Sequence, residues 1–202
     1  MKKELVLAIY DREYTWIENI NKDIKITKYN KNLSNILDGE IMIIPNVGRD
    51  VHTFFYHIVK NYDFLSDYII FSQDFPFDHV GNYVEIINGD VITWDNNSKQ
   101  KFGECWFFNT QYGVLTFNQD GSPEHPGLNI LPVWNELFSD PMASQSQFAP
   151  AGHFCVSKEH IRLLPKSYYE KIKNILETNE KSPWIIERLE PYIFNPNVTK
   201  KI

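Results

Sequence analysis

The sequence contains few cysteines, no basic stripe and no long apolar run near its start, and each of these features limits the class of protein. Only two of its 202 residues are cysteines, too few for a disulfide framework, and neither lies in a Cys-x-x-Cys motif. Lys and Arg form no basic stripe and the net charge is −6, so nucleic-acid binding is not expected. The first apolar run, residues 5–9, is too short for a signal peptide or a membrane span. The composition therefore predicts a cytoplasmic protein without a transmembrane segment.

Motifs that would identify a metal enzyme are missing as well. The histidines form no His-x-His or His-x-x-x-His pair, and no Asp-x-Asp is present. Aromatic residues, in contrast, are abundant at 15% of the chain, with 11 Tyr and 14 Phe. Most of these rings are expected to fill the core, but exposed ones can serve as platforms for sugars or bases.

The length fits one α/β domain, and the first 79 residues have a repeating order of strands and helices. Continuous apolar runs predict buried strands at 5–9, 41–44 and 68–71, and alternation predicts another at 23–29. A short helix capped by Thr15 is expected from Trp16. Apolar residues spaced as on one helical face, from Val51 to Tyr62, predict a helix docked on the sheet. Crossover connections of this kind produce mostly parallel strands.

The second part, residues 80–202, is less regular until its last third. Runs at 91–94, 105–108 and 114–117 are typical of strands, and turn residues at 120–127 predict a loop long enough to act as a flap. A strand at 153–156 and three helices, beginning near Ser157, Lys166 and Ser182, complete the chain.

Polar residues follow each strand predicted in the first part. They are the groups at 10–12, 28–31, 46–52 and 73–79. Because the carboxyl ends of parallel strands meet at one edge of a sheet, we expect these groups to converge on a ligand site there.

The segment from Asn46 to Asp50 precedes a helix, where backbone amides favour an anion and the Arg49 guanidinium can bind phosphate. Alternatively, Asn46 or Gly48 only caps the helix and Arg49 pairs with Asp50. His52 lies on the flank of the apolar stripe near this site. His57 is five residues further on and points away, so the two histidines do not form a metal pair.

Asp74, Asp78 and His79 follow the strand at 68–71. Two carboxylates at a strand end can bind Mg²⁺ or Mn²⁺, which prefer oxygen ligands. Alternatively, both aspartates form side-chain-to-backbone turns around Pro76. In the flap loop, Asp120, Glu124 and His125 are further candidates, for which a solvated loop is the favoured interpretation.

Four motifs together resemble a family defined only as a domain of unknown function. This family is marked by an N-x-G-R-E-A-x-x-Y-x-x-H-I-x-x-N-Y-D helix and by a strand ending in F-L-Q-x-x-P-F-D-H. The corresponding segments here are 46–63, with Asp50 in place of Glu, and 71–79, while 151–157 and 187–194 are similar to two further motifs. The order of the motifs resembles that of glycosyltransferase-A enzymes, with a mostly parallel, Rossmann-related sheet flanked by helices.

The resemblance implies a glycosyltransferase that moves a sugar from a nucleotide-diphosphate sugar to a saccharide or lipid-linked acceptor. Such enzymes synthesise bacterial capsule or lipopolysaccharide, in the cytoplasm or at the inner face of the membrane. Residues 1–79 would then form the nucleotide-binding half and 80–202 the acceptor half. The alternatives are a metal-dependent hydrolase using Asp78, His79, His125 and His153, and a non-catalytic carbohydrate-binding module.

Each candidate residue has an expected role. The nucleotide-sugar ligands are Tyr10, Asp11, Lys28, Asn30, Asn46, Gly48, Arg49, His52 and Gln73. Glu187 and His79 are the catalytic candidates, with Glu187 as acceptor base or, alternatively, a surface partner of Arg188. Gly152 and His153 would contact the acceptor, and Asp74 and Asp78 would hold the divalent metal.

Overall fold

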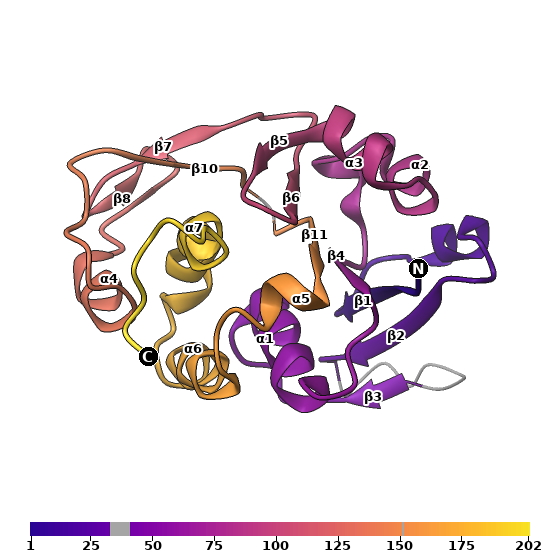
Figure 1. Cartoon of the computed structure of the whole chain (residues 1–202), viewed down its shortest axis with the longest axis horizontal. Helices are drawn as coiled ribbons and strands as arrows, with labels where there is room; N and C mark the ends of the chain where they lie inside the picture. Colours follow the sequence, from indigo (N-terminus) through magenta and orange to yellow (C-terminus); the bar gives the residue numbers. More distant parts are fainter. Residues whose placement is uncertain (33–40, 151) are drawn as a thin grey trace.

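A mixed sheet forms the centre of the structure, a computed structural model that describes residues 1–32, 41–150 and 152–202 (Figure 1). Its strand order is β3-β2-β1-β4-β11-β6-β5. The strands of the first part pair in parallel, as the sequence predicts: β1 (Lys3–Ile9), β2 (Lys25–Asn30), β3 (Ile41–Ile43) and β4 (Tyr68–Gln73).

The other half of the sheet is antiparallel. Strand β11 (Phe154–Ser157) runs antiparallel to β4 and to β6 (Cys105–Phe108), and β5 (Ser98–Lys101) runs antiparallel to β6. The direct β4–β11 pairing joins the two predicted halves into one sheet. The architecture is therefore α/β with a mixed sheet, parallel only in its first half.

Helices cover both faces of the sheet. The remaining elements are η1 (Thr15–Asn19), α1 (Arg49–Asn61), η2 (Pro76–Asp78), α2 (Tyr83–Asn88), α3 (Val91–Asn97), β7 (Leu115–Phe117), β8 (Gly121–Ser122), β9 (His125–Pro126), α4 (Leu131–Leu137), β10 (Ser146–Phe148), α5 (Lys158–Ile161), α6 (Lys166–Thr178) and α7 (Ser182–Ile193). Helices α1, α6 and α7 lie on one side, and α2 and α3 lie on the other (Figure 1).

Strand β1 shows how the sequence builds both layers. Val6 and Ala8 belong to the core cluster under α1 and α6, whereas Leu5, Leu7 and Ile9 belong to the cluster under α2 and α3. Successive strand side chains point to opposite faces, so a continuous apolar run is needed where both faces are covered.

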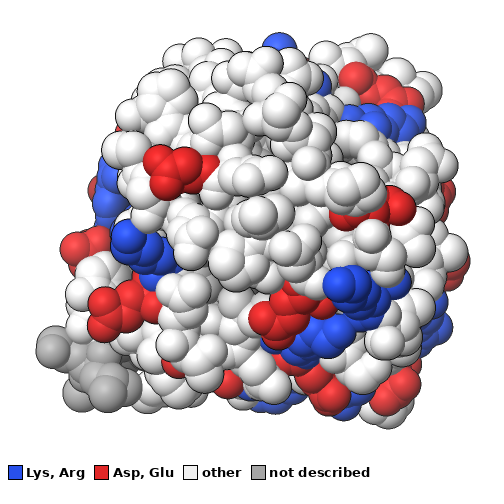
Figure 2. Space-filling model, turned by 90° about the vertical axis from the view of Figure 1, so that its left-hand side faces the viewer, with Lys and Arg blue, Asp and Glu red and all other residues white. Residues whose placement is uncertain are grey.

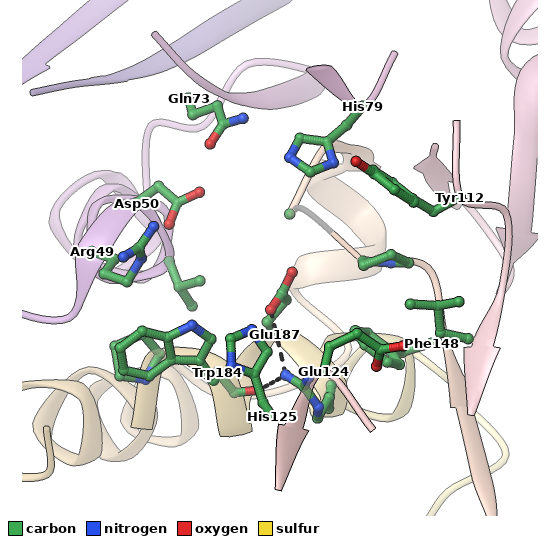
Figure 3. A pocket seen from close by; sticks show the side chains of 16 residues that line it. Arg49, Asp50, Gln73, His79, Tyr112, Glu124, His125, Phe148, Trp184 and Glu187 are labelled. Atoms are coloured by element: carbon green, nitrogen blue, oxygen red, sulfur yellow. Dashed lines mark hydrogen bonds and ion pairs between the residues drawn. The ribbon is translucent and has the colours of Figure 1, made fainter. Parts of the chain in front are cut away.

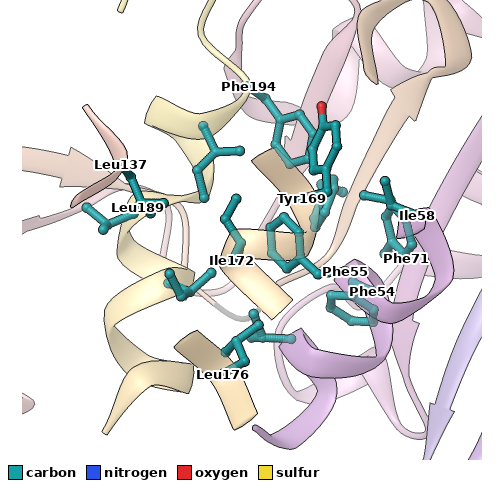
Figure 4. Packing of buried hydrophobic residues seen from close by; sticks show 14 of the residues in the cluster. Phe54, Phe55, Ile58, Phe71, Leu137, Tyr169, Ile172, Leu176, Leu189 and Phe194 are labelled. Carbon is teal, nitrogen blue, oxygen red and sulfur yellow. The ribbon is translucent and has the colours of Figure 1, made fainter. Parts of the chain in front are cut away.

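The helix predicted from Val51 is α1, and its apolar stripe packs as expected. Phe54 and Phe55 are completely buried among rings from β4, β11, α6 and the end of α7 (Figure 4). Burial of one such side chain contributes roughly 1.5–3 kcal/mol. This packing fixes the start of α1 relative to the ends of β1 and β4.

Gly48 precedes α1 in the left-handed region, with a φ of 62°. A Cβ atom there would lie 2.7 Å from the Cβ of His52. Arg49 also has a positive φ, 54°, which costs a non-glycine residue roughly 1–3 kcal/mol. Backbone strain of this kind clusters at functional sites.

Two predictions of local structure require correction. Residues 91–94, predicted as a strand, form the start of α3, because the Asp90 carboxylate accepts hydrogen bonds from the backbone N–H groups of Ile92 and Thr93. This cap outweighs the strand preference of the β-branched residues. The helix expected from Trp16 is a 3₁₀ turn, and the Thr15 hydroxyl donates to Glu13 instead of capping it.

The end of the molecule formed by β7, β8, β10 and α4 carries scattered charges of both signs (Figure 2). The loop predicted at 120–127 lies here and contains the short hairpin of β8 and β9. Among the described residues, no helix is both long and apolar enough to cross a membrane.

Candidate functional site

Two adjoining cavities lie beside the carboxyl ends of β1 and β4. The strand-end cavity, of about 410 Å³, is lined by residues that follow β1, β2 and β4, among them Tyr10, Asp11, Lys31 and Asn46. The flap cavity, of about 380 Å³, is lined by the loop at 120–127, by α7 and by His79. Arg49, Asp50 and Gln73 line both cavities. The predicted convergence of polar strand ends is therefore present.

Asp74 holds the loop after β1 in place. Its Oδ2 atom accepts hydrogen bonds from the backbone N–H groups of Tyr10, Asp11 and Arg12, at 3.0, 3.2 and 3.0 Å, and its Oδ1 atom accepts one from Phe75 at 3.0 Å. The residue is 7% exposed. Because backbone donors already surround this carboxylate, it fits an anchor of the loop after β1 better than a metal ligand, and only the bond from Phe75 belongs to a local turn before Pro76.

Asp78 lies at the surface and forms an ion pair with Arg12, 2.7 Å between Nη1 and Oδ2. The Arg12 guanidinium lies over the Phe75 ring, 4.3 Å from its centroid. Within the described ranges, no three His, Cys, Asp or Glu side chains are grouped to hold a metal ion. The donors around Asp74 and Asp78 thus do not fit a Mg²⁺ or Mn²⁺ site, and the metal stays a prediction from the sequence.

Lys31 is the buried cation of the strand-end cavity. Its Nζ donates to the carbonyl oxygens of Val47, at 2.5 Å, and Arg49. Burial lowers its pKa to about 8, and the neighbouring Asp50 carboxylate opposes that shift. Lys31 therefore both holds the turn before α1 and places positive charge in the cavity.

The neighbouring candidates Lys28 and Asn30 do not line either cavity. Asn30 is buried, and its Oδ1 accepts a hydrogen bond from the backbone N–H of Asn32. Lys28 lies within β2, two residues before the strand ends. Lys31, the first residue after β2, lines the strand-end cavity instead. Tyr10, the first residue after β1, lines the same cavity.

His79 faces the flap cavity across from Asp50 and Gln73 (Figure 3). Its ring lies beside Tyr112, with ring centroids 5.4 Å apart, and its buried Nδ1 has no hydrogen-bond partner within the described part of the chain. Burial lowers the pKa of His79, with Asp78 and Asp50 opposing the shift. Burial therefore favours the neutral form of this imidazole.

Glu187 also lines the flap cavity, and its carboxylate lies 3.6 Å from Arg188. Arg188 is 1% exposed, and its guanidinium donates to Ser122 Oγ and to the carbonyl of Trp184. Burial lowers the pKa of Arg188, whereas Glu187 acts to raise it. Glu187 thus points into the cavity and pairs with Arg188 at the same time.

Gly152 lines the flap cavity with a positive φ of 57°. A Cβ atom at this position would lie 3.2 Å from Phe54 Cε2 and 3.8 Å from Asp50 Oδ2. Glycine therefore leaves space above the Asp50 carboxylate. His153, the other predicted acceptor ligand, is 1% exposed and lies behind His79, with ring centroids 5.9 Å apart.

The buried ring of His153 predicts acid sensitivity. Burial lowers its pKa to about 3, and unfolding returns it to about 6.5. Its contribution is complete above pH 6.5 and is lost as pH falls toward 3, by up to about 1.4 kcal/mol per pH unit. We expect His153→Phe to flatten the fall in the free energy of unfolding between pH 6 and 4, measured by urea titration. An unchanged slope would show that His153 does not cause it.

His52 does not reach the site. It is completely buried, and its Nε2 lies 3.1 Å from Glu177 Oε1 on α6. Burial lowers its pKa to about 4. The predicted position on the flank of the stripe placed it near the cavity, but α6 packs on that flank. Gly48 likewise lines neither cavity and shapes the turn that places Arg49.

Several residues that line the flap cavity were not predicted as site residues, among them Asp50, Tyr112 and Trp184. The Arg49 guanidinium lies 5.3 Å from the centroid of the Trp184 ring, and His125 lies 5.8 Å from it on the flap (Figure 3). Asp50 directly follows Arg49, which was predicted as a site residue, and this position in the sequence could have indicated that Asp50 also lies at the site. No local pattern distinguishes Trp184 from a core ring.

Comparisons of the chain with protein-family models, with curated proteins and with solved structures gave no match.

Proposed function

We propose that this protein is a glycosyltransferase of the glycosyltransferase-A type that uses a nucleotide-diphosphate sugar. The observation that carries the proposal is the pair of adjoining cavities at parallel strand ends, joined by Arg49, Asp50 and Gln73. A transfer reaction between two substrates needs such an arrangement, with the donor and the acceptor meeting at a shared wall.

The strand-end cavity suits the nucleotide. The Tyr10 ring is 47% exposed and offers a stacking surface. Lys31 and Arg49 supply cations for the diphosphate, and Arg49 is also a bidentate hydrogen-bond donor. In this proposal, Gln73 contacts the transferred sugar at the shared wall.

The flap cavity suits a saccharide acceptor. Trp184 and Tyr112 supply aromatic surface, while Glu124, His125 and Glu187 supply hydrogen-bonding groups. Sugar sites combine aromatic faces with polar groups in this way. The acceptor class is a saccharide or a lipid-linked saccharide, as in the synthesis of a bacterial surface polysaccharide at the inner face of a membrane.

A panel of nucleotide-diphosphate sugars tests this function. We expect at least one of them to raise the melting temperature and to be hydrolysed slowly without an acceptor. Stabilisation by oligosaccharides alone would instead support a carbohydrate-binding module. Hydrolysis of phosphate esters that requires an added metal would support a metal-dependent hydrolase, and either result would contradict the proposal.

Arg49→Ala is expected to weaken nucleoside-diphosphate binding by about 1.5–3 kcal/mol, roughly 10- to 150-fold in Kd, because charge-assisted bonds to phosphate are lost. Calorimetric titration measures this change. Lys99→Ala removes an exposed positive charge on β5, at the far edge of the sheet, and serves as the control. An unchanged Kd in Arg49→Ala would remove Arg49 from the diphosphate site.

A further inference from the structure

Among the described residues, Asp50 is the one carboxylate that lines both cavities, together with Arg49 and Gln73. Its oxygens also accept hydrogen bonds from the backbone N–H groups of Asp50 and Val51. Asp74 also reaches the strand-end cavity, but four backbone N–H groups donate to its oxygens. Glu187 reaches the flap cavity and not the strand-end cavity.

The side of Asp50 that faces the flap cavity is open. Gly152 lies opposite, and even a Cβ atom on that residue would be 3.8 Å from Asp50 Oδ2. Because Gly152 has no side chain, a hydroxyl group in the flap cavity can approach this oxygen atom. The positive φ of Gly152 disfavours any other residue there.

We propose that Asp50 is the general base that accepts the proton of the acceptor hydroxyl, a role that rests on the proposed glycosyl transfer. The proton passes from the hydroxyl to the Asp50 carboxylate as the hydroxyl oxygen bonds to the anomeric carbon of the donor sugar. The bond between that carbon and the phosphate oxygen breaks, and its electron pair leaves with the nucleoside diphosphate. The Asp50 proton then passes to solvent.

The surroundings of Asp50 suit a base. Burial raises its pKa above the ordinary aspartate value, while Arg49, Lys31 and hydrogen bonds from the backbone N–H groups of Asp50 and Val51 act to lower it. Within the described part of the chain, His79 and Glu190 also interact electrostatically with Asp50. Burial favours the neutral form of both, since it lowers the pKa of His79 and raises that of the Glu190 carboxyl. A base whose pKa lies closer to neutrality binds the transferred proton more readily.

Glu187 is less suited to this role. Its carboxylate lies 3.6 Å from the buried Arg188 guanidinium and is engaged in that ion pair. It lies on α7 and lines only the flap cavity, so it does not reach the cavity proposed for the donor. We therefore assign proton abstraction to Asp50 rather than to Glu187.

The proposed role of Asp50 also implies a stereochemical outcome. A hydroxyl that attacks from the flap cavity while Asp50 takes its proton displaces the diphosphate in one step, and a direct displacement proceeds from the side opposite to the leaving group. The product therefore has the inverted anomeric configuration, which NMR of the product measures. Retention of configuration would contradict the assignment, because Asp50 would then act as a nucleophile or take no part.

Asp50→Asn tests the assignment with a side chain of the same size. We expect kcat for transfer to fall by roughly 10²- to 10⁴-fold, while Kd for the nucleoside diphosphate changes less than about threefold. The acid limb of the kcat–pH profile should disappear. Asp23→Asn, an exposed aspartate before β2 at the opposite end of the strands, is the matched control and keeps wild-type kcat.

A second variant covers misfolding and indirect effects. Asp50→Gly opens space at the carboxylate position, and added formate should restore part of the transfer rate. Near-normal kcat in Asp50→Asn, or a much larger loss in Glu187→Gln, would overturn the assignment and leave the transferase in place. If the wild-type protein neither binds nor turns over any nucleotide-diphosphate sugar, the proposed function itself fails.

Discussion

Asp74→Ala is expected to lower the free energy of unfolding by at least about 3 kcal/mol, because hydrogen bonds to charged groups contribute most. The Asp74 carboxylate, in a residue that is 7% exposed, accepts four backbone hydrogen bonds, and its removal leaves these four N–H groups without their charged acceptor. The loop bearing Tyr10 and Asp11 would also lose its anchor, so nucleotide binding should weaken in parallel. Urea denaturation measures the first effect and calorimetry the second.

Asp78→Ala is the matched control for Asp74. It removes an ion pair whose two side chains are about half exposed to solvent, so the free energy of unfolding should change little. If Asp74 were instead a metal ligand in an acidic cluster, its removal would leave stability unchanged or raise it. The two variants therefore distinguish a loop anchor from a metal site.

His79→Ala is expected to reduce the transfer rate by roughly 10- to 1000-fold with little change in melting temperature. The neutral ring faces the flap cavity, and its position between Asp50 and Tyr112 suits a hydrogen bond to a substrate. Steady-state kinetics with saturating donor measures the change. A structural histidine would tolerate His79→Gln, so wild-type kcat in both variants would show that the ring does not act on the substrate.

The elements that the sequence predicts best are those with a long regular pattern. The apolar stripe of α1 spans more than three turns, and the run in β1 is apolar on both faces, so neighbouring structure cannot easily override them. Residues 91–94 are a short β-branched run, and a single cap at Asp90 reverses the outcome. The antiparallel direction of β11 depends on long-range pairing, which no local pattern carries.

The convergence of polar residues at the strand ends followed from the same reasoning. Residues after parallel strands share an edge of the sheet, and Tyr10, Asn46 and Gln73 do line adjoining cavities. The sequence pattern did not show which way each side chain points. His52 turns toward α6 and Lys31 turns toward the cavity, because tertiary packing decides which side of a helix or loop is covered.

The flap side was the hardest to predict. Glu124 and His125 were favoured as a solvated loop, and both are exposed yet line the flap cavity. Trp184 belongs to α7, about sixty residues away in the sequence, and meets them only through the fold. A site whose residues come from distant segments has no local sequence pattern that reveals it. A site at strand ends can be recognised, because polar residues follow one apolar strand after another.

A structure of the protein with a bound nucleoside diphosphate tests the proposed site most directly. We expect the diphosphate in the strand-end cavity, in contact with Arg49 and near Lys31, with its terminal phosphate directed toward Gln73 and Asp50. A diphosphate bound elsewhere, or bound only through a metal held by Asp74 and Asp78, would contradict the proposed site.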